Sequence, residues 1–99
     1  MKTVTETYTV SWPEIDICDN FKFSTSINSE TFEFRFKWLN DRWNCWVTLP
    51  DGTVRDAGVY PNVVNWTGYN DYGLIFSTDL ADFNYNNLFL GTLVVAIWE

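Results

Sequence analysis

Hydrophobic and polar residues alternate with a period of two along most of this chain, and no stretch shows the period of a helix. Residues 31–39 show the alternation most clearly, because an aromatic ring occupies every second position and charged residues lie between the rings. Since successive side chains of a β-strand point to opposite faces, this segment is predicted to be a strand with its rings in the core. The inward residues are Phe32, Phe34, Phe36 and Trp38, and the outward ones are Glu33, Arg35 and Lys37.

The same pattern predicts six further strands. In residues 43–49 it places Trp46 on the face opposite to the other large apolar side chains. Residues 92–98 are apolar on both faces, which favours a strand that is central in its sheet or covered on both sides. The predicted strands are residues 3–10, with Val4, Tyr8 and Val10 on one face, and residues 21–27, 43–49, 53–57, 74–78 and 92–98.

Short polar segments predict tight turns between several of these strands. Residues 28–30, 40–42 and 50–52 combine Asn, Asp, Ser, Pro and Gly in the way that turns require. Residues 58–73 hold three of the five glycines and predict a long ordered loop or short, bent strands. Residues 79–91 fit no more than a single helical turn.

About seven short strands joined mostly by tight turns favour an all-β fold, either a small antiparallel β-barrel or a sandwich. The alternation alone does not separate these two architectures. With 99 residues and no linker or low-complexity segment, the chain is predicted to form one domain over residues 1–99.

The chain has more aromatic rings than one small core needs, with eight Phe, six Trp and five Tyr. Some rings are therefore predicted to be exposed, as they are at binding faces and subunit interfaces. The formal net charge is −7, and the six basic residues are dispersed along the sequence. Nucleic acid is disfavoured as a partner, because phosphate binding requires Lys and Arg gathered on one face.

Sequence patterns of catalysis are missing. The chain has no histidine, which excludes Ser–His and Cys–His nucleophile systems, and it has no phosphate-binding glycine pattern. The acidic pairs Asp16/Asp19, Asp51/Asp56 and Asp79/Asp82 are interpreted as solvated loop residues. A non-enzymatic protein is predicted.

No cofactor or metal is predicted either. A calcium site of Asp79, Asp82 and Asn84 lacks EF-hand spacing. Cys18 and Cys45 are too few for an ordinary zinc site without histidine, and they are interpreted as small buried side chains. Neither a signal peptide nor a membrane span is predicted from the apolar runs, so we expect a soluble protein that folds in a reducing compartment.

Trp46, Trp66, Tyr69 and Tyr72 are the candidate binding residues, because they lie off the inward pattern or in the glycine-rich segment. Three interpretations stay open. The rings can anchor a protein partner, since Trp and Tyr are enriched at interfaces. They can stack on sugars with amide groups nearby, or they can pack in the core. The nearby polar residues are Asn65, Asn70 and Asp71.

The order of features resembles a family of small phage tail proteins, the baseplate plug proteins of contractile-tailed phages. The resemblance covers about residues 20–98 and rests on "FEFRFKW", "NDRWNCW", "PDG" and the closing "LGTLVVAIWE". In the family's terms Trp46 matches a Trp-bearing strand, although Trp43 competes for that position. The other matching residues are Asn40, Arg42, Asp51, Gly52, Gly91 and Trp98.

The resemblance implies an all-β plug or connector at the baseplate hub and tail tube, without catalysis and without a cofactor. It implies multiple copies around the tail axis in contact with hub, tube and baseplate subunits. The protein is then expected in the virion after synthesis in the host cytoplasm. The alternative is a small carbohydrate-binding module that recognises surface glycans through Trp and Tyr stacking.

Overall fold

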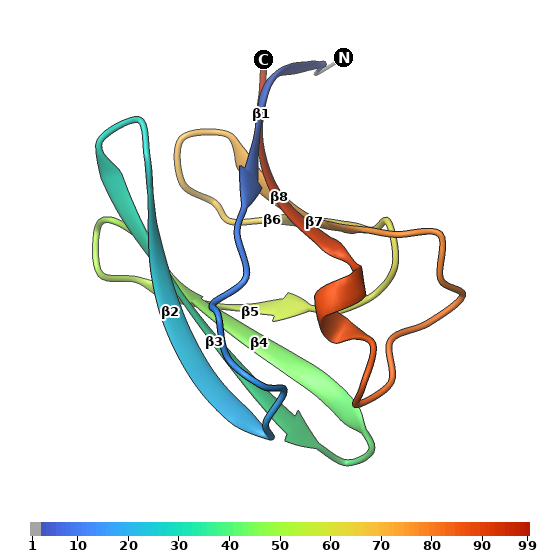
Figure 1. Ribbon diagram of the computed structural model, residues 1–99. Coiled ribbons are helices and arrows are strands. Elements are labelled where there is room, and N and C mark those ends of the chain that lie inside the picture. The colour runs from blue at the N-terminus through green and yellow to red at the C-terminus, as the bar shows by residue number, and fades with distance from the viewer. Residues whose placement is uncertain (1–2) are drawn as a thin grey trace.

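The chain folds as a β-sandwich of two four-stranded antiparallel sheets in a computed structural model that describes residues 3–99 (Figure 1). The all-β prediction is confirmed, and the architecture is the sandwich rather than a closed barrel. One sheet, here the terminal sheet, has the order β1 (Val4–Val10), β8 (Thr92–Trp98), β7 (Tyr72–Ser77), β6 (Val64–Trp66). The other, the meander sheet, has the order β2 (Asn20–Ile27), β3 (Glu30–Leu39), β4 (Arg42–Thr48), β5 (Val54–Gly58).

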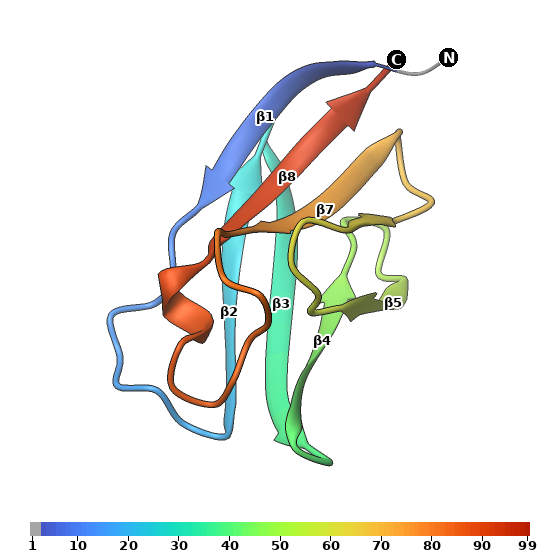
Figure 2. The same cartoon turned by 90° about the vertical axis from the view of Figure 1, so that its right-hand side faces the viewer.

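All seven predicted strands are present within two residues of their predicted bounds. The predicted loop over residues 58–73 contains an eighth strand, β6, which is only three residues long. The helical turn expected within residues 79–91 is the 3₁₀ helix η1 (Leu88–Leu90). The apolar strand β8 is central in its sheet, as predicted, since it pairs with β1 and with β7. Figure 2 shows β1 and β8 side by side and antiparallel, so that β8 ends beside the start of β1.

The N-terminal strand differs from the prediction. Its pairing with β8 slips between Val4 and Glu6, which is the irregularity of a β-bulge. Val10 is buried, whereas Val4 is 42% exposed, so Val4 and Val10 do not share the core face. A bulge reverses the inward and outward positions on one side of it, which period-two counting does not detect.

Two hairpins of the meander sheet are closed by two-residue turns with left-handed backbone. Asn28 and Ser29 have φ of 52° and 64°, and Asn40 and Asp41 have φ of 54° and 58°. Two consecutive positive φ angles define the type I′ turn, whose twist matches that of the flanking strands. These turns fix the register, with Ile27 opposite Glu30 and Leu39 opposite Arg42.

The core is centred on the rings of β3, which face the terminal sheet. Phe32, Phe34 and Phe36 are each 0% exposed, as predicted. The ring of Phe36 lies 5.9 Å from that of Phe76 on β7, so rings join the two sheets directly. The fourth predicted ring, Trp38, is only partly buried, because β3 there reaches the end of the sandwich and Trp38 packs on Trp43 and Tyr85.

We expect Phe34→Ala to lower the free energy of unfolding by about 3–5 kcal/mol, because it opens a cavity between the sheets. Urea denaturation of the variant measures this value. Glu33→Ala on the opposite face of the same strand is the control, with an expected change within about 0.5 kcal/mol. Equal effects of the two substitutions would contradict the assignment of Phe34 to the core.

Candidate binding faces

The described residues offer no clustered metal ligands. Within residues 3–99 there is no group of three or more His, Cys, Asp or Glu side chains placed to hold a metal ion. The carboxylate of Asp82 accepts a hydrogen bond from the Phe83 backbone N–H at 2.8 Å. The Asn84 side chain accepts backbone N–H bonds from Asn86 and Asn87 at 2.9 and 3.1 Å. These oxygens stabilise the turn before η1.

The two cysteines are free thiols. Cys45 lies in the core of the meander sheet, and this burial raises the pKa of its thiol well above the ordinary range. Cys18 is half-buried, and its thiol donates to the Asn20 backbone carbonyl at 3.6 Å. The interpretation as a small buried side chain is therefore confirmed for Cys45 and only in part for Cys18. No helix in the described part of the chain is long and apolar enough to span a membrane.

The four candidate aromatic residues do not form one site. Trp46 lies on the outer face of the meander sheet, between the buried residues Cys45 and Val47. Trp66 is 53% exposed and belongs to the terminal sheet. Tyr69 is partly buried, and Tyr72 is only 4% exposed. The structure thus separates Trp46 from Trp66 and assigns the two tyrosines a different role.

Tyr69 and Tyr72 hold the turn before β7 against the first hairpin of the meander sheet. Their rings stack at 6.1 Å, and that of Tyr72 packs edge-on against Phe32 at 5.2 Å. Tyr69 Oη donates to Glu30 Oε1 at 2.7 Å, and Tyr72 Oη donates to Glu30 Oε2 at 3.3 Å. Tyr72 is therefore a core residue and not a surface anchor, which corrects the sequence-based expectation. The pKa of Tyr69 is raised, mainly by the hydrogen bond to Glu30 and secondly by burial.

Trp66 belongs to an apolar outer surface that we call the tryptophan face. It consists of the apolar outward residues of β6, β7 and β8, and the polar Ser77 and Thr92 border it at one end: the apolar residues are Val64, Trp66, Gly73, Ile75, Val94, Ala96 and Trp98. The rings of Trp66 and Trp98 meet edge-on at 5.1 Å. Ala96 is 0% exposed although it points away from the core, because the larger side chains around it on this face cover it.

Gly73 makes room for the two indoles. A Cβ atom at this position would lie 3.0 Å from Trp98 Nε1 and 3.1 Å from Val64 Cγ1. The absence of a side chain therefore lets the Trp98 ring settle onto the sheet. Trp98 Nε1 is buried there without a hydrogen-bond partner among residues 3–99.

Three cations gather on the opposite side of the molecule, on what we call the cationic face. It is the outer face of the meander sheet and presents three cations, three apolar residues and two acids: Lys22, Arg35, Lys37, Leu39, Trp46, Val54, Glu33 and Asp56. Lys22 lies directly opposite Arg35, and Arg35 lies directly opposite Trp46. The expectation that the basic residues are dispersed is therefore wrong for these three, because strand pairing brings together positions that are distant in sequence.

A shallow hollow of about 480 Å³ lies on the cationic face, with Trp46 among its lining residues. Leu39 and Val54 are apolar parts of its lining and are 40% and 58% exposed. Arg35 and Lys37 supply cationic groups, and Glu33 supplies the carboxylate. An apolar hollow bordered by cations suits an acidic ligand that also offers an apolar group.

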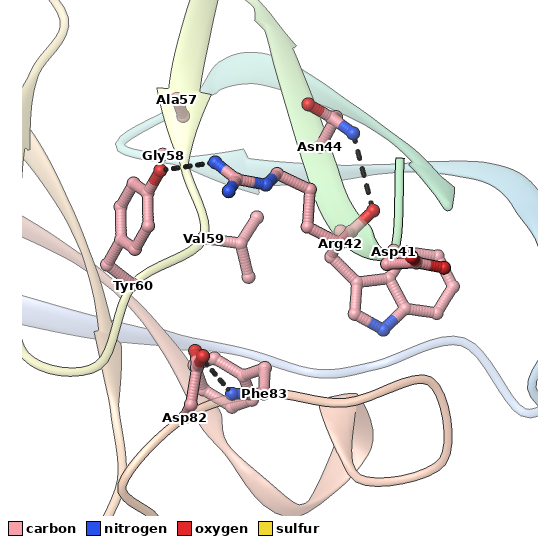
Figure 3. Close-up of a pocket in the computed structure, with 10 residues that line it drawn as sticks. Asp41, Arg42, Asn44, Ala57, Gly58, Val59, Tyr60, Asp82 and Phe83 are labelled. Carbon is pink, nitrogen blue, oxygen red and sulfur yellow. Dashed lines mark hydrogen bonds between the residues drawn. The ribbon is translucent and has the colours of Figure 1, made fainter. Parts of the chain in front are cut away.

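A smaller pocket of about 160 Å³ lies between the start of β4 and the segment that follows β5 (Figure 3). Arg42 Nη1 donates to Tyr60 Oη at 3.0 Å, while Asp82 and Phe83 lie on the other side of the pocket. Gly58 also permits this arrangement, because a Cβ there would meet Tyr60 Cδ2 at 2.8 Å. Arg42 thus positions the chain after β5, beyond its expected role in the turn.

The remaining residues of the family pattern are structural. Asn40 adopts φ of 54° in its turn, and Gly52 adopts φ of 90° after Pro50 and Asp51. The Thr53 backbone N–H donates to Asp51 Oδ1 at 2.9 Å, and this bond lowers the pKa of that carboxyl group. Gly91 ends η1, and its carbonyl accepts a 2.8 Å bond from Trp12 Nε1.

No known protein family model, curated protein or solved structure matches this chain. The resemblance to baseplate plug proteins therefore stays a prediction.

We expect Tyr69→Phe to lower the stability of the protein near neutral pH, because it removes the hydrogen bond to Glu30. A raised pKa in the folded state means that this contribution is fully present below about pH 10, the ordinary pKa of tyrosine. It is lost as the pH rises through the raised pKa of Tyr69. The stability difference between wild type and Tyr69→Phe should therefore shrink above about pH 10, as measured by urea denaturation between neutral and alkaline pH.

Glu30→Gln is the control for this experiment, since it keeps an acceptor oxygen and removes the charge. Glu30→Gln should lose less stability than the wild type as the pH rises from neutral to alkaline values. A stability difference between wild type and Tyr69→Phe that stays constant through the alkaline range would contradict the role of the Glu30 bond.

Proposed function

We propose that this protein is a non-enzymatic assembly protein that joins other subunits through the outer faces of its sandwich. The observation that supports this most directly is the tryptophan face. Trp66 is 53% exposed there and rests against Trp98, over a surface whose other side chains are almost all aliphatic. Core side chains already fill the space between the sheets, so these two indoles are additional to what the fold requires.

The setting that we propose is the baseplate of a contractile phage tail, where the chain acts as a plug or connector between hub and tube. This part of the proposal is supported by the sequence resemblance over residues 20–98. Several copies around the tail axis would contact hub, tube and baseplate subunits in the virion. Permanent assemblies of this kind use interfaces that are large and apolar at their centre.

A carbohydrate-binding role is the second candidate, and the hollow around Trp46 is the observation that favours it. A half-buried indole lies there among Arg35, Lys37, Glu33 and Thr48. A flat ring surrounded by polar groups can stack on a sugar while its neighbours bond to hydroxyls.

We expect Trp66→Ala to weaken the complex with the hub and tube proteins by about 2 kcal/mol or more, about thirty-fold in affinity. Co-expression followed by titration of the purified subunits measures the loss. The substitution should cost at most about 1 kcal/mol of fold stability, because Trp66 is half-exposed. Trp43→Ala, which empties a core position, is the control that should unfold the chain. Unchanged affinity in Trp66→Ala would contradict the proposed role of the tryptophan face.

We expect a glycan panel to separate the two candidates. Binding of a sugar at the hollow would change tryptophan fluorescence in the wild type but not in Trp46→Ala. If no glycan in the panel changes the fluorescence of the wild type, the carbohydrate candidate is rejected.

A further inference from the structure

The three cations of the cationic face lie together and outnumber the two acidic residues on that face, Glu33 and Asp56. Lys22 and Arg35 are directly opposite each other on neighbouring strands, and Lys37 follows on the same face of β3. Like charges placed directly opposite each other destabilise a strand pair. Within residues 3–99, the side chains of these three residues form no hydrogen bond or ion pair. Such an arrangement favours the binding of an anionic group.

The rest of the molecule is strongly acidic. Of thirteen Asp and Glu residues, only Glu33 on β3 and Asp56 on the edge strand β5 point outward from the strands of the cationic face. The remaining eleven acidic residues outnumber the three remaining basic residues, of which Lys2 lies outside the described part of the chain. The formal charge of −7 thus conceals two surfaces of unlike charge. A second copy of this chain is itself a source of the acidic surface that the cationic face lacks.

One acidic segment also has the matching apolar group. Residues 14–19, between β1 and β2, present Glu14, Asp16 and Asp19 as exposed carboxylates. Ile15 lies between the first two and is 46% exposed. An exposed isoleucine flanked by carboxylates complements an apolar hollow flanked by cations.

The segment is held in place by its own contacts. Ile17 and Cys18 pack against the core, and the carbonyl of Asp19 accepts a bond from the Trp38 backbone N–H at 2.8 Å. The Ile15 N–H donates to the Pro13 carbonyl at 2.9 Å. The chain therefore presents Ile15 on an ordered support, which lowers the entropy cost of docking.

We propose that copies of this protein associate head to tail, with residues 14–19 of one copy docked on the cationic face of the next. Ile15 enters the hollow at Trp46, and the carboxylates of Glu14 and Asp16 lie against Arg35 and Lys37. The contact joins two different surfaces, so repetition closes a ring or extends a filament. This inference rests on the proposed assembly role and specifies one contact between identical subunits.

Sedimentation velocity of the purified protein tests the proposal. The sedimentation coefficient should rise with protein concentration at about 20 mM salt, and this rise should weaken at about 500 mM salt, where charges are screened beyond about 4 Å. Charge reversal on the face (Arg35→Glu with Lys37→Glu) and on the segment (Glu14→Lys with Asp16→Lys) should each give a monomer. An equimolar mixture of these two variants should associate again, because each acidic surface then meets a basic one.

Asp79→Lys with Glu99→Lys is the control for net charge. It changes the formal charge as much as the segment variant does and should leave association intact. Circular dichroism of every variant checks the fold. The proposal is overturned by a wild type that stays monomeric at all concentrations, by a segment variant that still associates, or by a mixture that stays monomeric.

Two further measurements show what the cationic face binds if it does not bind a second copy of the chain. Binding of a thymidine oligonucleotide to the wild type, lost in the face variant, would assign the cationic face to single-stranded nucleic acid and overturn self-docking. Formation of the complex with hub and tube proteins is measured in the same variants. A hub complex without self-association overturns this inference alone, whereas self-association without a hub complex overturns only the proposed phage setting.

Discussion

Phe32, Phe34 and Phe36 fill the space between the two sheets, and the positions of the other elements follow from their burial. Each ring points from the central strand β3 toward the terminal sheet, where Tyr72 and Phe76 receive two of them at 5.2 and 5.9 Å. Burial of three such rings requires that both sheets be present and in register. Because β3 alternates strictly, the side chains between its rings must all point to solvent. The alternation along β3 therefore determines both the core and the cationic face.

Much of the fold follows from sequence by this reasoning. The alternation within residues 31–39 identifies the core, and the Asn-rich turns are short enough to fix hairpin register. That register also predicts which basic residues lie next to each other, which the composition does not reveal. Once Ile27 is opposite Glu30, Lys22 must be opposite Arg35, so the length of the turn and the spacing of the cations together imply the cationic face. Counting basic residues along the chain gives no such information.

Other features depend on contacts between segments that no local pattern encodes. The bulge in β1 reverses the exposure of Val4 relative to Val10, and nothing in "TVTETYTV" marks its position. Tyr72 belongs to the core because Glu30 and Phe32, some forty residues earlier, receive its hydroxyl and its ring. The exposure of Trp66 was predicted, but its partner Trp98 was identified only as part of a closing strand. Their contact requires the pairing of β6 with β7 and of β7 with β8.

Gly73, which lies within β7, determines how far the indole rings of the tryptophan face protrude from the sheet. Any larger residue there would lift the Trp98 indole off the backbone by a few tenths of an ångström or more, since a Cβ atom at that position would lie only 3.0 Å from the indole nitrogen. The ring of Trp66, which leans on Trp98, would be displaced with it. The height to which the indoles protrude is thus set by a residue that no partner needs to touch, and the shape that a neighbouring subunit meets can change without any change in the residues at the contact.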